Sequence, residues 1–167
     1  MLNNSNKAIT FDVIKYVPLK PAYCSFTTEN ILQLNNSFQK VDTGWTEVVT
    51  PVNISYLDGI FTTLESGVFQ WNLERIYDNH DQNPSSPIEL FIEVRKNGIN
   101  VFERDIVIGS ATGPAEPTTI TFNSPFIFTV ETNDYFEFYV KATEGDGSPS
   151  DTNLIRMQIS ANKIYNK

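Results

Sequence analysis

The sequence predicts an all-β protein, a two-sheet antiparallel sandwich of the jelly-roll kind. Most segments after residue 50 are short and alternate apolar with polar residues, the period-two pattern of half-buried strands. Turn residues separate these segments at regular spacing, and few stretches show helical periodicity. Such spacing without intervening helices is typical of a β-sandwich or jelly roll. A chain of 167 residues is long enough for one domain with a single core, to which 12 Phe and 7 Tyr contribute.

The N-terminal segment 1–20 differs from the rest of the chain, which we expect to form the domain over residues 21–167. It has a polar, Asn-rich head, then a strand-like alternation of Ile9, Phe11 and Val13 that ends in prolines. Two interpretations are open. The segment is either an edge strand of the same domain or an arm that attaches to a partner, because exposed apolar residues in an arm need a partner surface to cover them.

The segment 64–77, LESGVFQWNLERIY, contains the most distinctive strand. After Gly67, the apolar Phe69, Trp71 and Leu73 alternate with Gln, Asn and Glu, so one face is predicted to lie in the core and the other in water. Nothing in the stretch indicates chemistry. The predicted core residues of this region are Phe61, Gly67, Phe69, Trp71 and Leu73.

A β-hairpin is predicted over 88–108, IELFIEVRKNGINVFERDIVI. Asn97 and Gly98 form the dipeptide that supplies the positive φ angles of a type I′ turn. The return strand is expected from 100 to 108. The residues predicted to face the core on the first strand are Leu90, Ile92 and Val94.

Four further segments complete the predicted sheets. ISYLDGIF (54–61) is expected to be one strand followed by a turn. The segment 118–130 is a strand interrupted near Pro125, which predicts an edge position or a bulge because proline cannot donate to the ladder. Segments 135–142 and 154–164 are the last two strands. Their predicted inward residues are Phe136, Phe138, Val140, Ile155, Met157, Ile159 and Ala161.

Composition and charge exclude several function classes. The formal net charge is −8 and no Lys/Arg cluster stands out, so we expect no binding to nucleic acid, which requires clustered cations. No apolar stretch approaches the ~20 residues of a membrane span, so no membrane insertion is expected. We expect no signal peptide, and a single cysteine allows no intrachain disulfide.

The sequence contains few candidate residues for catalysis or metal binding. His80 is the only histidine and Cys24 the only cysteine, and we expect a solvated loop histidine and a buried thiol rather than a nucleophile–base pair. Glu74, Glu93 and Glu137 are expected to be solvated outward positions rather than a glycosidase pair. The acidic residues of the polar loops are expected to serve ordinary turns, and calcium binding is the weaker alternative. No other cofactor is expected. The candidate calcium ligands, all in or beside polar loops, are Asp78, Asp81, Glu144, Asp146 and Asp151.

Several motifs together resemble those of C1q-like domains. The spacing of Phe61, Gly67, Phe69 and Trp71 resembles the second half of the family signature, a Phe followed by Gly-x-Tyr-x-Phe and a further aromatic residue. The segment PAYCSF (21–26) is similar to the first strand of the family. The Asn-Gly hairpin is also similar. Phe and Trp stand where the family has Tyr and Phe, and the first half of the signature matches poorly.

The resemblance spans roughly residues 21–165 and implies a C1q/TNF-like jelly roll of ten short strands in two sheets, typically a trimer. An acidic, disulfide-free, Asn-rich chain of this kind looks more like a bacteriophage virion protein, such as a head-fibre, decoration or fibre-knob protein, than a secreted animal protein. In such a trimer, part of the outer face carrying Tyr135, Tyr139 and Phe91 is expected to contact a neighbouring subunit.

The expected function is therefore non-enzymatic. The chain is predicted to be a structural component of the virion, a capsid decoration or head-fibre protein attached through its N-terminal segment to the capsid or another virion protein. The alternative is a carbohydrate-binding or receptor-binding module that recognises a host-surface glycan through Tyr135, Tyr139 and the loops 78–87 and 109–117. A hydrolase on the same scaffold is a further alternative, which the single histidine disfavours.

Overall fold

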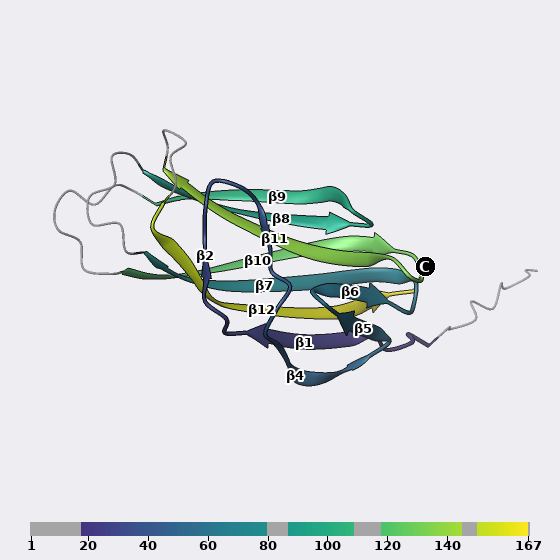
Figure 1. Cartoon of the computed structure of the whole chain (residues 1–167). Coiled ribbons are helices and arrows are strands. Elements are labelled where there is room, and N and C mark those ends of the chain that lie inside the picture. Colours follow the sequence, from purple (N-terminus) through teal and green to yellow (C-terminus); the bar gives the residue numbers. More distant parts are fainter. Residues whose placement is uncertain (1–17, 80–86, 109–117, 145–149, 167) are drawn as a thin grey trace, which may run out of the picture.

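A computed structural model describes residues 18–79, 87–108, 118–144 and 150–166. These residues form twelve strands and no helix, and the strands build two six-stranded antiparallel sheets that pack face to face (Figure 1). The predicted all-β jelly-roll class is confirmed. Predictions for Ile9, Phe11, Val13, His80, Asp81, Asp146 and the loop 109–117 lie outside the described residues.

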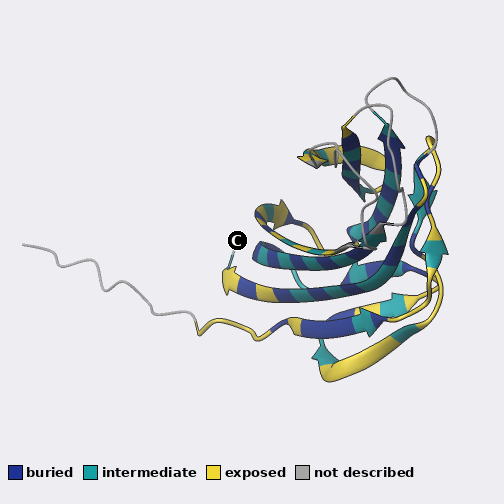
Figure 2. Cartoon of the chain, turned by 90° about the vertical axis from the view of Figure 1, so that its left-hand side faces the viewer, coloured by how far each residue is buried: buried dark blue, intermediate teal, exposed yellow. Residues whose placement is uncertain are grey.

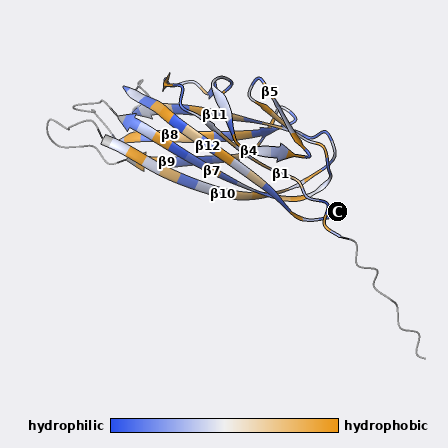
Figure 3. Ribbon diagram, turned by 90° about the horizontal axis from the view of Figure 1, so that it is seen from below, coloured by the Kyte–Doolittle hydropathy of each residue, from blue (hydrophilic) through white to orange (hydrophobic). Residues whose placement is uncertain are grey.

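Sheet 1 contains the longest strands of the molecule. Its strand order is β10-β7-β12-β1-β4, and the short β2 pairs with β12. The strands are β1 (Tyr23–Thr28), β2 (Leu32–Gln33), β4 (Trp45–Val52), β7 (Gly67–Asn79), β10 (Thr118–Val130) and β12 (Thr152–Tyr165). Figure 3 shows that hydrophilic and hydrophobic residues alternate along these strands, as they do in strands with one buried face.

Sheet 2 has the strand order β5-β6-β11-β8-β9, and the short β3 pairs with β11. Its strands are β3 (Gln39–Lys40), β5 (Ile54–Leu57), β6 (Ile60–Thr63), β8 (Ile88–Lys96), β9 (Ile99–Ile108) and β11 (Tyr135–Glu144). The edge strands β9 and β10 therefore close one long side of the sandwich, and β4 and β5 close the other.

The core lies between the two sheets, where strands of each sheet turn every second residue inward (Figure 2). Phe61, Phe69, Trp71 and Leu73 are fully buried, on the side that the alternation predicts. Trp71 is the largest fully buried side chain of the described residues, and its ring contacts that of Phe136 across the interface at 4.7 Å. Aromatic rings from both sheets thus fill the centre of the sandwich.

The predicted hairpin between β8 and β9 is present. Asn97 and Gly98 have φ angles of 53° and 78°, which a two-residue turn of type I′ requires. The Asn97 side chain also ties this turn to the β10–β11 turn: it donates to Asp134 Oδ1 at 2.7 Å and accepts from the Tyr135 amide at 3.0 Å. The turn residue therefore joins the β8–β9 hairpin to the connection that runs from β10 of sheet 1 to β11 of sheet 2.

Pro125 lies in β10, which is an edge strand of sheet 1. β10 runs unbroken from Thr118 to Val130 and pairs along its whole length with β7. The predicted interruption near Pro125 is therefore wrong, and the predicted edge position is confirmed, because an edge strand tolerates a residue that cannot donate on one side.

Two strand predictions are wrong. The segment 54–61 is two strands rather than one, because Asp58 and Gly59 take positive φ angles of 48° and 74° and reverse the chain between β5 and β6. In β12, a register shift between Leu154 and Arg156 moves the inward position. Leu154 is therefore buried and Ile155 only half-buried, since one extra residue in a strand transfers its neighbours to the other face.

Candidate functional site

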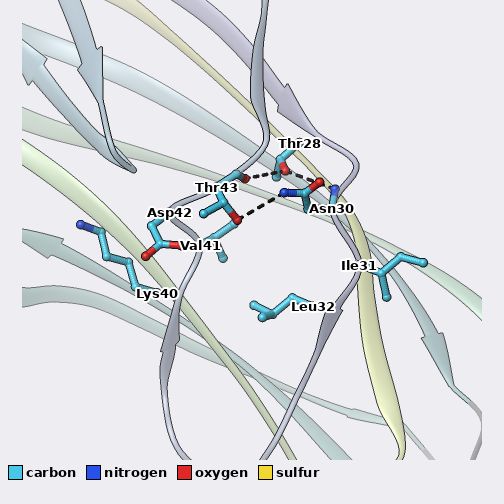
Figure 4. Close-up of a pocket in the computed structure, with 8 residues that line it drawn as sticks. All are labelled: Thr28, Asn30, Ile31, Leu32, Lys40, Val41, Asp42 and Thr43. Carbon is cyan, nitrogen blue, oxygen red and sulfur yellow. Dashed lines mark hydrogen bonds between the residues drawn. The ribbon is translucent and has the colours of Figure 1, made fainter.

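A polar groove lies where the chain leaves β1 and where it leaves β3; we call it the Asn30 groove (Figure 4). Its volume is about 200 Å³. Thr28 Oγ1 donates to the Thr43 carbonyl at 2.9 Å, and Asn30 Nδ2 donates to Thr43 Oγ1 at 3.3 Å, so both walls are joined by hydrogen bonds. The lining residues are Thr28, Asn30, Ile31, Leu32, Lys40, Val41, Asp42 and Thr43.

The groove offers hydrogen-bonding groups but no pair suited to catalysis. Lys40 forms an ion pair with Glu137, and the two charged groups are 2.9 Å apart. Asp42 is the one carboxylate among the lining residues. No histidine or cysteine lines it. A nucleophile activated by a base needs both groups within hydrogen-bond reach, so the groove can hold a small polar ligand and does not itself supply acid–base chemistry.

The outer face of sheet 2 carries the residues predicted to contact a neighbouring subunit. There, cationic side chains of the same chain cover aromatic rings. The Arg95 guanidinium lies 3.9 Å from the centre of the Tyr139 ring, and Lys141 Nζ lies 4.1 Å from that of Phe91 and 4.6 Å from that of Phe38. We call this set the cation–aromatic ladder. Tyr139 and Phe91 are consequently half-buried within one chain, and Tyr135 on the same face is half-buried as well.

Acidic side chains complete the cation–aromatic ladder. Glu93 forms an ion pair with Arg95, and Glu137 one with Lys40. Glu93 is only 5% exposed, so the expectation that it is solvated is wrong. Its carboxylate is paired with Arg95 of the same strand, and Tyr139 lies opposite it on β11. Tyr139 is also unsuited to stacking on a sugar from the side that Arg95 occupies.

The outer face of sheet 1 is polar with few charges, a feature that the sequence analysis missed. A shallow hollow of about 140 Å³ lies on this face, and its one charged residue, Glu74, is 3.7 Å from Arg156. The lining residues are Asn72, Glu74, Asn123, Gln158 and Ser160. The alternation in β7 does identify these outward positions. Their amide side chains, however, do not by themselves indicate a function.

A buried cationic group lies on the opposite, inner face of β7. Arg75 is fully buried, and its Nη2 donates to Ser124 Oγ at 2.7 Å. Its Nε and Nη1 have no hydrogen-bond partner, and neither has the buried hydroxyl of Tyr77. Burial lowers the pKa of Arg75, Tyr77 opposes that shift, and the positive charge of Arg104 adds to it. Sequence alternation places Arg75 inward, but a core arginine was not anticipated.

The candidate calcium ligands do not assemble into a site within the described residues. Asp78 lies near the end of β7, Glu144 ends β11 and Asp151 precedes β12, all close to the same end of the sandwich. No group of three or more His, Cys, Asp or Glu side chains that could hold a metal ion occurs in the part of the chain described.

Cys24 lies on the inner face of β1 and is buried. Burial raises the pKa of its thiol to about 12, and a hydrogen bond with the Ala161 backbone opposes this shift only in part. Because the thiolate is the nucleophilic form, Cys24 is inert at neutral pH. Among the described residues, no helix is long and apolar enough to cross a membrane.

Comparisons with known proteins identify the fold and no family. No family model and no curated protein matches the chain. Among solved structures, Eiger TNF from S. frugiperda is 11% identical and superposes with a TM-score of 0.59, covering 89% of this chain and 96% of that one. Murine APRIL at pH 5.0 is 11% identical, with a TM-score of 0.53 over 87% of this chain and 100% of its own.

A third similar structure is the PRD1 vertex protein P5, which is 12% identical. It has a TM-score of 0.50 and covers 86% of this chain and 96% of its own. Identities this low show a shared fold alone. The chain is therefore a jelly roll of the TNF/C1q-like type.

Proposed function

We propose that the protein is a non-enzymatic structural component of a virus particle, a capsid decoration or head-fibre protein attached through its N-terminal segment. The observation that carries this proposal is the likeness of its fold to that of the PRD1 vertex protein P5. The acidic, disulfide-free composition supports the same assignment.

The arrangement of the ends supports attachment from one side. Pro18 accepts a hydrogen bond from Asn166 at 3.0 Å, and the Ala22 carbonyl accepts one from the Lys163 amide at 2.8 Å. The chain therefore enters the domain beside its C-terminal strand (Figure 1). The strand ends at Asn79, Glu144 and Thr152 lie at the opposite end. An N-terminal attachment would present that opposite end away from the particle.

Self-association, which we propose is trimeric, is supported by the charge distribution. Copies of a chain with net charge −8 repel one another, so they approach best through a face with few charges. The outer face of sheet 1 is such a face, and its amides can pair across an interface. The cation–aromatic ladder is the competing face, because its rings are only half-covered.

Binding to virus particles tests the attachment proposal. The full chain and a variant lacking residues 1–17 are mixed with particles purified without this protein, and bound protein is measured by co-sedimentation. We expect the full chain to sediment with the particles and the truncated variant, checked for an unchanged melting temperature, to stay in solution. A truncated variant that binds as well as the full chain removes the role of the segment, and a full chain that never binds removes the virion role.

The Asn30 groove supports a second candidate function, recognition of a glycan. Its hydroxyl, amide and carboxylate side chains are the groups that hydrogen-bond to sugars. A glycan array decides between the candidates. A sugar-binding protein gives a signal that Asp42→Asn abolishes and Glu103→Gln, on the exposed β9, retains, whereas a purely structural protein gives none.

A further inference from the structure

Of the four arginines in the chain, two have carboxylate partners among the described residues. Arg95 pairs with Glu93 on the outer face of sheet 2, and Arg156 with Glu74 on that of sheet 1. Neither Arg75 nor Arg104 forms an ion pair with any residue that the structure describes. The chain has 20 acidic residues against 12 basic ones, so a shortage of acids does not explain this.

The two unpaired arginines lie near each other at the β9–β10 side of the sandwich. Arg75 points inward from β7, beside Ser124 of the edge strand β10. Arg104 has the same strand parity as the half-buried Phe102 and Ile106, which turn toward sheet 1. The pKa of Arg75 is lowered mainly by burial. The positive charge of Arg104 lowers it further, to a smaller extent. Two like charges thus lie on the same side of the sandwich, Arg75 buried and Arg104 exposed at the edge.

The buried donors around Arg75 are incompletely used. One of its three guanidinium nitrogens donates to Ser124 Oγ. Nε, Nη1 and the Tyr77 hydroxyl have no well-aligned hydrogen-bond partner, although Tyr77 lies close enough to the guanidinium to offset part of the lowering of its pKa. The Phe122 ring, 6.0 Å from the guanidinium carbon, offers only its π face. A buried cation without a counter-charge is strongly destabilising, and each unmade hydrogen bond of a buried donor adds to the cost. An anion with several acceptor oxygens would satisfy these donors and supply the counter-charge.

We propose that Arg75 and Arg104, with Tyr77 and Ser124, bind a small inorganic oxyanion of the phosphate or sulfate class between β7, β10 and β9. Guanidinium groups match tetrahedral oxyanions in charge and in hydrogen-bond geometry. An oxyanion between the two arginines replaces their repulsion by two attractions and supplies acceptors for the unused donors. It is a structural ion that joins the two sheets at the β9–β10 side of the sandwich.

The ion enters from the edge between β9 and β10. The Arg75 guanidinium has no contact with solvent in this structure, so binding requires a side chain to move. Arg104 is exposed on an edge strand, and a long exposed side chain reorients without disturbing the core. Movement of Arg104 away from Arg75 makes room for an ion that both then hold.

Thermal unfolding measures the binding. The protein is titrated with sodium phosphate, and sodium chloride at matched ionic strength is the reference. We expect a melting temperature that rises with the logarithm of the phosphate concentration, by roughly 5–10 °C at about 100 times the dissociation constant. In Arg104→Gln, which changes an exposed residue, the phosphate concentration needed for a given rise in melting temperature is about tenfold higher or more. Arg75→Met abolishes the effect and, without phosphate, is at least as stable as the wild type.

Arg156→Gln is the matched control, because it removes the same charge from the outer face and should respond to phosphate as the wild type does. Equal melting temperatures of the wild type in phosphate and chloride overturn the proposal. So does a phosphate response of Arg104→Gln equal to that of Arg156→Gln, since the effect would then be one of surface charge. Neither result depends on whether Arg75→Met folds.

Discussion

Trp71 is the single side chain on which the core depends most. It is fully buried, and its ring contacts Phe136 and Phe138 of the opposite sheet at 4.7 and 6.0 Å. We expect Trp71→Ala to lower the free energy of unfolding by about 3–5 kcal/mol, because it removes a large buried ring and leaves a cavity. Urea unfolding measures the change. Gln70→Ala, on the other face of the same strand, should change it by less than about 0.5 kcal/mol; a reversed order would contradict the assigned faces.

Gly67 shows why one residue of the predicted motif must be small. Its φ is +154°, and a Cβ built on it would lie 2.5 Å from the Tyr165 carbonyl oxygen and 2.5 Å from Lys163 Cε. The Lys163 side chain can move, but the backbone of β12 cannot move freely. We therefore expect Gly67→Ala to destabilise the protein by about 1–3 kcal/mol in chemical unfolding. Ser66→Ala, one residue earlier, is the control; equal effects of the two would contradict the steric cause.

At this scale, period-two alternation predicted the direction of most side chains, because one face of each strand must be buried. It correctly predicted that Phe69, Trp71 and Leu73 point into the core. The same alternation places Arg75 on the inner face. What alternation cannot convey is how a charged residue is tolerated at an inward position. That depends on Ser124, whose hydroxyl accepts a hydrogen bond from Arg75 and which the fold brings from β10.

Among the elements, the β8–β9 hairpin is held by its turn residue in two ways. Asn97 has a positive φ, and its side chain bonds both Asp134 and the Tyr135 amide. Asn97→Ala loses both features and is expected to lower the free energy of unfolding by about 1–3 kcal/mol. Asn97→Gly keeps the backbone freedom and loses only the bonds, so it should cost less than Asn97→Ala. Equal melting temperatures of the wild type and Asn97→Ala would show that the turn is not under this constraint.

The elements were predictable where a local sequence sets the geometry. The Asn-Gly turn and the proline of the edge strand β10 each impose a backbone constraint that is visible in one or two residues. The Asp58–Gly59 turn has the same chemistry, but the strands beside it are only four residues long and were read as one. The register shift in β12 has no local signal, because it arises from pairing with β7.

For the whole molecule, the fold class was predictable because it follows from the number and spacing of strands. The candidate sites were not, because each combines residues from distant segments. The Asn30 groove joins the residues after β1 to those after β3, and the cation–aromatic ladder needs Arg95 above Tyr139 on the neighbouring strand. Alternation identified Tyr139 as outward but could not show that a cation of the same chain covers it.

At the scale of the whole molecule, the outer faces of the two sheets determine how copies of the chain associate. If copies associate through sheet 1, the purified chain should have three times its mass of 18.9 kDa in light scattering after size exclusion. Asn72→Lys with Asn123→Lys adds two charges to that face, which desolvation makes costly in an interface, and should give a monomer. Tyr135→Lys, on the outer face of sheet 2, should leave the trimer intact. The opposite result, a trimer with the lysines on sheet 1 and a monomer with Tyr135→Lys, would assign the interface to the cation–aromatic ladder. A monomeric wild type would mean that copies are brought together only by the particle to which they attach.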